Sequence, residues 1–105
     1  MAQFSEVVRD DGVCVVRTAG ELDIAAAEDF IEVVRTSLGR CGTVEIDLGD
    51  VTFIDSSGLG ALVRLRKEAD AENANLYLFN VSAATDRLLR ITGLVEYFDI
   101  RASQS

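Results

Sequence analysis

The sequence predicts a single small α/β domain, with a mixed sheet of four to five strands, an antiparallel hairpin at its start and three main helices. Two observations predict this fold class. The dipeptide Asp11-Gly12 lies between two apolar runs, a pattern typical of a β-hairpin. Beyond it, short apolar runs alternate with segments of helical periodicity, and this strand–helix order makes neighbouring strands parallel through right-handed crossovers.

The hairpin strands are expected over residues 4–8 and 13–18. In the second strand, Cys14 and Val16 point to one face and Val13 and Val15 to the other. Because both faces are apolar, this strand is expected inside the sheet rather than at its edge. The sequence Gly20-Glu21-Leu22-Asp23 is expected to end it.

The first helix is expected over residues 25–38. Asp23 is a suitable N-cap and Gly39 a suitable C-terminal residue. Apolar residues recur between them at the spacing that places them on one helical face, namely Ala27, Phe30, Ile31, Val34 and Leu38.

The second half of the chain repeats the alternation. Residues 43–48 show the period-two pattern of a strand, which Gly49-Asp50 ends or bends before the apolar run 51–54. A second helix is expected over 59–69 and a strand over 76–79. Ser82 and Gly93 are expected to cap a third helix with Leu88, Leu89 and Ile91 on its apolar face. A short strand is expected within 95–100, and residues 101–105 are expected to form a flexible tail.

Composition places limits on function. A chain of 105 residues fits one domain, over residues 1–105, with enough surface buried on folding to form a core. No window contains the roughly 20 continuous apolar residues of a membrane helix. The first residues lack a basic region followed by a long apolar run, so we expect a cytoplasmic protein rather than a secreted one. Nothing in the sequence requires more than a monomer.

Charge and residue types also exclude several classes. The net charge of −8 disfavours nucleic-acid binding, which depends on cationic contacts, and favours partners with basic surfaces. The absence of histidine excludes a Ser-His-Asp hydrolase and argues against a zinc hydrolase. No Gly-Lys-Ser or Gly-Lys-Thr occurs for a phosphate-binding loop. We therefore predict no cofactor and no enzymatic activity.

The two cysteines do not suggest a disulfide scaffold or a zinc site by their number or spacing. Cys14 lies in an apolar strand and Cys41 in an expected loop, so buried and semi-buried thiols are the expected state. A redox role would require their Cα atoms to lie within about 7 Å, and none is predicted.

The most informative motif is Asp55-Ser56-Ser57-Gly58-Leu59-Gly60, at the junction between an apolar run and a helix. The first N–H groups of a helix lack internal partners, so Ser56 or Ser57 can cap them and a phosphate is tolerated there. Gly58 and Gly60 would allow another surface to approach the backbone closely. Ser56 is therefore the candidate switch residue. Since the carboxyl ends of parallel strands lie on one edge of the sheet, the 20–23 loop is expected on the same side as the loop that carries Ser56.

In the segments 20–23 and 53–60 and in its order of elements, the chain resembles a bacterial anti-sigma factor antagonist of the STAS domain family. The resemblance implies that an anti-sigma factor with serine kinase activity phosphorylates Ser56, and that a serine phosphatase restores the hydroxyl. It also implies that only the unmodified form binds the anti-sigma factor and releases the sigma factor. The predicted partner-binding residues are Gly20, Glu21, Asp23, Asp55, Ser56, Ser57, Gly58 and Leu59.

Two other interpretations remain open from the residues. The chain could be an unphosphorylated scaffold of the same fold in a transporter or signalling assembly, where the Ser-Ser-Gly turn only packs. It could also be an enzyme that holds Mg²⁺ between Glu21, Asp23 and Asp55, provided that the three carboxylates converge.

Overall fold

The computed structural model describes residues 1–101, and its chain begins with a hairpin. Strands β1 (Gln3–Val8) and β2 (Cys14–Leu22) pair antiparallel. In the turn, Gly12 adopts a φ of +87°, a conformation that costs glycine little, and Asp11 accepts a hydrogen bond from the Val13 N–H. The predicted hairpin is confirmed.

Parallel strands follow the hairpin, each reached through a helical segment. The order is α1 (Ile24–Cys41), β3 (Thr43–Ile54), α2 (Ser56–Ala71), β4 (Asn75–Phe79), α3 (Ala83–Thr92), the short 3-10 helix η1 (Val95–Tyr97) and β5 (Asp99–Arg101). In the sheet the five strands lie in the order β1-β2-β3-β4-β5. From β2 to β5, each strand is parallel to the next one. The predicted mixed sheet and its three main helices are confirmed.

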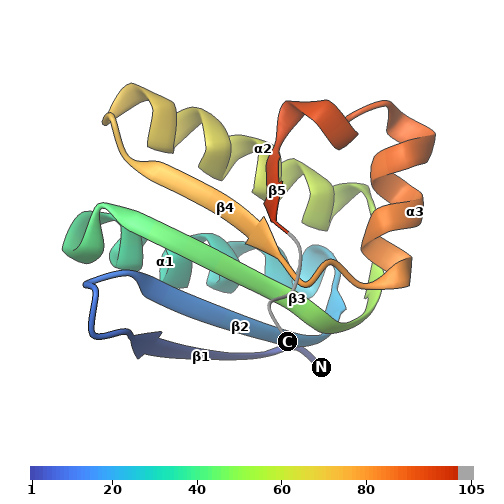
Figure 1. Cartoon of the computed structure of the whole chain (residues 1–105). Helices are drawn as coiled ribbons and strands as arrows, with labels where there is room; N and C mark the ends of the chain where they lie inside the picture. The colour runs from blue at the N-terminus through green and yellow to red at the C-terminus, as the bar shows by residue number, and fades with distance from the viewer. Residues whose placement is uncertain (102–105) are drawn as a thin grey trace.

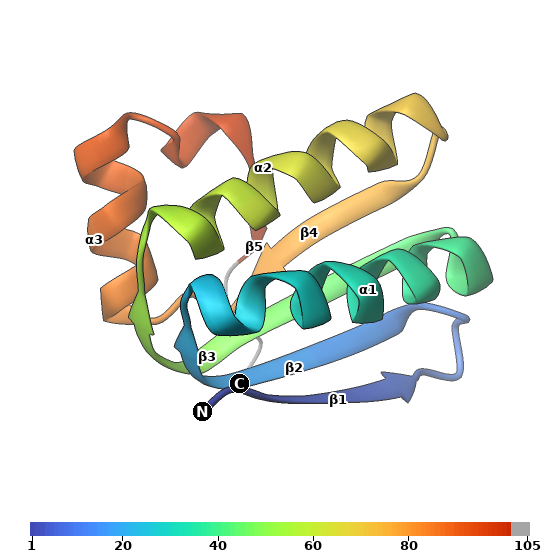
Figure 2. The ribbon, with the colours of Figure 1, turned by 180° about the vertical axis from the view of Figure 1, so that it is seen from behind.

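The main core lies between the sheet and two helices. Helices α1 and α2 run side by side over one face of the sheet (Figure 2), whereas α3 lies at one end and packs against β3 (Figure 1). Phe30 of α1, Leu62 of α2 and Ile46 of β3 are all fully buried. Within residues 1–101, no helix has both the length and the apolar character needed to cross a bilayer.

One bidentate ion pair joins the two helices that cover the sheet. Arg35 of α1 donates to both carboxylate oxygens of Glu68 of α2, at 2.9 and 2.8 Å. The hydrogen bond from Arg35 lowers the pKa of Glu68 from its ordinary value, although partial desolvation opposes this shift. Because the folded state favours the ionised form, the pair stabilises the fold above the unfolded-state pKa, and this contribution is lost as the pH falls through the lower folded-state pKa.

We therefore expect Glu68→Gln to reduce the free energy of unfolding by up to about 1 kcal/mol at pH 7, as for a solvent-accessible ion pair. Urea unfolding of both proteins between pH 7 and pH 3 tests this, and the difference should disappear at the acidic end. Glu32→Gln is the control, because Glu32 is more exposed and lies 3.8 Å from Arg35. A difference for Glu68→Gln that does not depend on pH would contradict the electrostatic explanation.

Several elements extend beyond their predicted ends. Helix α1 continues through Gly39 to Cys41, and Gly42 caps it with a left-handed φ of +73° and an N–H bond to the Leu38 carbonyl. Strand β2 continues through Gly20 to Leu22 with shifts in register. Strand β3 continues through Gly49-Asp50 to Ile54, so the two predicted apolar runs are one strand. The prediction that Gly39 ends the helix is wrong. The predicted strand bound at Thr18 is too early, although β2 does end within the Gly20–Asp23 segment, at Leu22.

The C-terminal end also differs from prediction. Residues 95–97 form a 3-10 turn, and the final strand is confined to Asp99–Arg101. Arg101 pairs with Phe79 in the sheet, and its guanidinium lies 3.7 Å from the centroid of the Tyr77 ring. The predicted tail over 101–105 therefore begins too early. Its remaining residues, 102–105, lie outside the described part of the chain.

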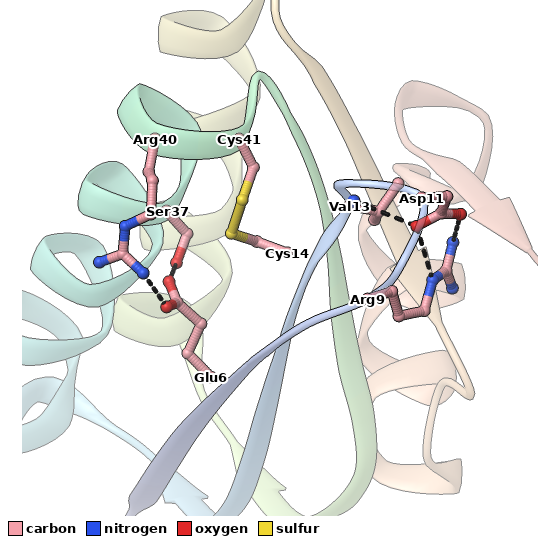
Figure 3. The surroundings of a disulfide bond; sticks show 8 residues. All are labelled: Glu6, Arg9, Asp11, Val13, Cys14, Ser37, Arg40 and Cys41. Carbon is pink, nitrogen blue, oxygen red and sulfur yellow. Dashed lines mark hydrogen bonds and ion pairs between the residues drawn. A yellow bond between two sulfur atoms is a disulfide. The ribbon is translucent and has the colours of Figure 1, made fainter.

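The two cysteines form a disulfide, which corrects the expectation of free thiols. Cys14 at the start of β2 and Cys41 at the end of α1 are 27 residues apart in sequence, but their Cα atoms lie 5.8 Å apart. This separation is within the usual disulfide range. Figure 3 shows the bond beneath the last turn of α1. The crossover from β2 to α1 brings the helix back over the start of the strand, a proximity that sequence spacing does not reveal.

Candidate functional site

Two strand–aspartate–helix junctions lie next to each other at one edge of the sheet. The final residues of β2 and β3, Leu22 and Ile54, are partners in the parallel register. Each is followed by an aspartate that caps a helix, Asp23 for α1 and Asp55 for α2. The two predicted loops therefore share an edge, where α1 and α2 both begin (Figure 2). In open α/β sheets, this carboxyl edge is the usual binding position.

The two aspartates accept hydrogen bonds from backbone N–H groups in the first turn of their helices. Asp23 accepts from the Ala26 N–H at 3.1 Å, as its predicted capping role requires. Asp55 accepts from the Ser57 and Gly58 N–H groups at 2.9 and 3.2 Å. The prediction that Ser56 or Ser57 caps the second helix is therefore wrong. Because an aspartate satisfies these donors, the Ser56 hydroxyl is not needed for the cap.

Ser56 is the first residue of α2 and its side chain is exposed. Ser57, next to it, is half-buried, and so are Asp23 and Asp55. A group attached to the Ser56 oxygen would project from the helix N-terminus, where the backbone dipole favours negative charge. The arrangement leaves one hydroxyl accessible at the junction without making the helix depend on it.

Gly58 has no side chain, and this allows the two junctions to pack against each other. A Cβ atom at this position would lie 2.2 Å from the carbonyl oxygen of Leu22 and 2.9 Å from the side chain of Ile54. Glycine thus allows the first turn of α2 to pack directly on the end of β2. The sequence suggested that this missing side chain serves an approaching partner, but the chain's own backbone occupies the space. At Gly60 nothing lies within 4 Å of such a Cβ, so that position is open.

The other predicted partner-binding residues differ in their exposure. Leu59 is 7% exposed and belongs to the core. Gly20 has a φ of +91°, and a Cβ there would lie 2.4 Å from the Met1 carbonyl oxygen, so it accommodates the start of the chain. Glu21 is exposed, with its carboxylate 3.7 Å from the N-terminal amine. The accessible polar part of the edge thus contains Glu21 and Ser56, with Asp23, Asp55 and Ser57 partly accessible.

Three exposed apolar side chains near this edge were missed by the sequence analysis. Ile24, Phe53 and Ile91 are 78%, 48% and 74% exposed. Ile24 and Ser57 line one hollow of about 310 Å³ between the first turns of α1 and α2. Phe53 and Ile91 line another, of about 260 Å³, between β3 and α3. The sequence analysis placed Ile91 on the buried face of α3, which is wrong.

The acidic residues do not form a cation site. Among residues 1–101, no group of three or more His, Cys, Asp or Glu side chains is arranged to hold a metal ion. The convergence of Glu21, Asp23 and Asp55 that the magnesium interpretation required is therefore not found in this part of the chain. Asp23 and Asp55 instead direct oxygens at backbone N–H groups.

Comparison with known proteins agrees with this architecture. The family model described as "STAS domain" matches residues 5–105. The chain is also 33% identical over 97 residues to the anti-sigma-B factor antagonist of Staphylococcus epidermidis, covering 90% of this chain and 89% of that protein. The chain belongs to the STAS domain family.

Solved structures resemble this STAS domain over nearly its whole length. An anti-sigma factor antagonist from Mycobacterium paratuberculosis has a TM-score of 0.84 and 25% identity, covering 95% of this chain and 85% of that one. The Bacillus cell fate determinant SpoIIAA in its phosphorylated form has a TM-score of 0.75 and 24% identity, covering 98% and 93%. At 24% identity, the likeness to SpoIIAA supports a shared fold only. The family predicted from the motifs is thus confirmed.

Proposed function

We propose that this STAS domain is an anti-sigma factor antagonist that binds an anti-sigma factor through the edge carrying Asp23 and Ser56, and that phosphorylation of Ser56 blocks binding. The observation that supports this most directly is the exposed Ser56 at the start of α2, in a chain 33% identical to an anti-sigma-B factor antagonist. The fold is shared with SpoIIAA, for which a phosphorylated form is known.

The local structure makes Ser56 suitable for reversible modification. The hydroxyl is exposed, so a kinase and a phosphatase can both reach it. Asp55 supplies the cap of α2, so esterification of the Ser56 oxygen removes no capping hydrogen bond. A phosphate at a helix N-terminus is also favoured by the helix dipole. The modified protein should therefore keep its fold and change only its surface.

The surroundings explain how a phosphate would change recognition. Unmodified Ser56 presents a small neutral hydroxyl at an edge that also exposes Ile24, Phe53 and Ile91, and such apolar side chains suit a partner that excludes water. A phosphate adds about −1.5 to −2 charges to a chain that already carries −8. Docking would then require removal of water from the new charge, at a high cost in free energy.

In this proposal the anti-sigma factor is also the serine kinase, and a serine phosphatase regenerates the binding form. Binding of the unmodified protein releases the sigma factor. The exchange takes place in the cytoplasm, and one copy of the domain is sufficient for it. Glu21, Asp23 and Ser57 contribute polar contacts around Ser56, and the chain performs no catalysis of its own.

Incubation with the anti-sigma factor encoded in the same genome and ATP tests the proposal. Peptide mass spectrometry should find phosphate on Ser56, and Ser56→Ala should remain unmodified. Ser57→Ala is the matched control and should still accept phosphate on Ser56. If Ser56 acquires no phosphate and the protein copurifies with a membrane transporter instead, the scaffold interpretation replaces this one.

A further inference from the structure

The disulfide uses both cysteines of the chain, and they differ sharply in accessibility. Cys14 is fully buried within the core, whereas Cys41 is half-buried at the end of α1. The residues on either side of Cys41, Arg40 and Gly42, are exposed. In the folded protein, a small oxidant or thiol is therefore expected to reach Cys41 first, because Cys14 is fully buried.

We propose that Cys14 and Cys41 are a reversible thiol–disulfide site, with Cys41 as the residue that reacts with external disulfides or thiols and Cys14 as the residue that resolves the intermediate. The inference goes beyond the proposed function and does not depend on it. It also accounts for the presence of a cysteine, rather than another small apolar residue, at a core position of β2.

The chemistry can be written with glutathione disulfide as the oxidant. The Cys41 thiolate attacks one sulfur of glutathione disulfide, the disulfide breaks, and one glutathione leaves as a thiolate. The Cys14 thiolate then attacks the Cys41 sulfur of the mixed disulfide, and the second glutathione leaves. Two protein thiols are oxidised, one glutathione disulfide is reduced to two glutathione molecules, and the two cysteine protons pass to the departing thiolates. Reduction follows the same steps in reverse.

The fold contains enough other contacts to persist when the bond is reduced. Glu6 of β1 accepts hydrogen bonds from Ser37 and Arg40 of α1 beside the disulfide (Figure 3). The Gly42 carbonyl accepts from the Asn75 N–H at 2.9 Å, which ties the end of the helix to β4. A reduced Cys14 would remain in the core as a small apolar side chain. Reduction should therefore loosen the β2–α1 unit without unfolding the domain.

The disulfide lies far from the proposed binding edge. Asp23 and Cys41 are at opposite ends of the 18-residue helix α1, which is about 27 Å long at 1.5 Å per residue. The β1–β2 turn and the end of α1 lie together at the end of the sheet opposite the α1 and α2 N-termini (Figure 1). Oxidation should thus change the stability of the domain and leave the surface around Ser56 unaltered.

The experiment uses the whole chain and glutathione as the probe. Protein reduced with dithiothreitol should remain folded by circular dichroism and should react with a thiol alkylating agent at Cys41. After native incubation with glutathione disulfide, neither cysteine should be alkylated on unfolding. From the usual effect of a disulfide on a domain of this size, the oxidised form should melt about 10–20 °C higher than the reduced form.

Two variants test the order of the steps. In Cys14→Ala the intermediate cannot be resolved, so glutathione should accumulate on Cys41. In Cys41→Ser the buried Cys14 should remain unmodified, and the melting temperature should be the same with and without reductant. The proposal is overturned if glutathione modifies Cys14 in Cys41→Ser, or if both thiols of the folded wild-type protein remain free after oxidation. The experiment does not depend on partner binding, so either result leaves the proposed function untouched.

Discussion

Phosphorylation of Ser56 is expected to weaken binding of the anti-sigma factor about a thousandfold, and Ser56→Asp about a hundredfold. Both figures follow from Coulomb repulsion at an effective dielectric of 20. One charge placed 4 Å from a carboxylate of the partner raises the free energy of binding by about 4 kcal/mol, which corresponds to a factor of roughly a thousand. The aspartate carboxylate reaches about 2 Å less far, and at about 6 Å the cost is about 2.8 kcal/mol, which corresponds to a factor of about a hundred.

A charge at Ser56 is expected to change partner binding without destabilising the fold. Ser56 is exposed and Asp55 provides the cap, so neither modification nor substitution removes an interaction that α2 requires. A carboxylate in the first turn of a helix is itself mildly favourable, by about 0.3–1 kcal/mol. The melting temperature of Ser56→Asp should therefore equal or slightly exceed that of the wild-type protein.

Isothermal titration calorimetry of the anti-sigma factor with three variants measures the effect. Ser56→Ala should bind as tightly as the unmodified protein. Ser56→Asn is the matched control, since asparagine has the size of aspartate without its charge, and it should bind more tightly than Ser56→Asp. Raising the salt concentration from 0.1 to 1 M shortens the Debye length from about 10 to 3 Å and should restore part of the affinity of Ser56→Asp. Equal weakening by asparagine and aspartate would show that size, rather than charge, blocks docking.

Features that depend on neighbouring residues could be predicted from the sequence. The Asp11-Gly12 turn, the Asp23 cap and the capping of α3 by Ser82 and Gly93 all have the predicted geometry. In each case a side chain or a glycine acts on backbone groups a few residues away, so the local sequence contains the necessary information. The position of Ser56 between a strand and a helix was predictable for the same reason.

Features that depend on contacts across the fold could not be predicted. Gly39 is a poor helix residue by about 1 kcal/mol relative to alanine, yet α1 continues past it because buried Leu38 and the half-buried Cys41 pack on the sheet. Gly49 and Asp50 remain within β3 because the chain continues to pair with β2 there, with Asp50 opposite Ala19 and Val51 opposite Gly20. The disulfide was missed because it joins the far ends of a strand and a helix.

In the candidate site too, local sequence predicts some features, whereas others depend on contacts across the fold. Serine and aspartate are both good N-caps, so the sequence could not decide which residue caps α2, and the structure assigns the cap to Asp55. Ile91 follows the apolar pattern of α3, but its side chain is 74% exposed, whereas that of Leu89 is fully buried. Apolar spacing alone therefore does not decide which of two apolar residues in the last turn of a helix faces the core.

Gly58→Ala is expected to lower the free energy of unfolding by about 1–3 kcal/mol, the usual range when an extra methyl group is forced into a packed region. The added Cβ would lie 2.2 Å from the Leu22 carbonyl oxygen. That oxygen belongs to the backbone of β2 at its last residue, which pairs with Ile54 of β3, so it cannot move away as a flexible side chain could. The alternative is a shift of the first turn of α2, which carries Ser56.

Gly60→Ala is the matched control, two residues further along the same helix. Nothing lies within 4 Å of a Cβ at Gly60, so the higher helix propensity of alanine should stabilise the protein by up to about 1 kcal/mol. Urea unfolding of the two variants should therefore give changes of opposite sign. If both variants were stabilised equally, the contact between α2 and Leu22 would not be tight, and the Asp23 and Ser56 junctions would not be rigidly coupled. If Gly58→Ala also weakens partner binding while Gly60→Ala does not, the relative position of the two junctions is part of what the partner recognises.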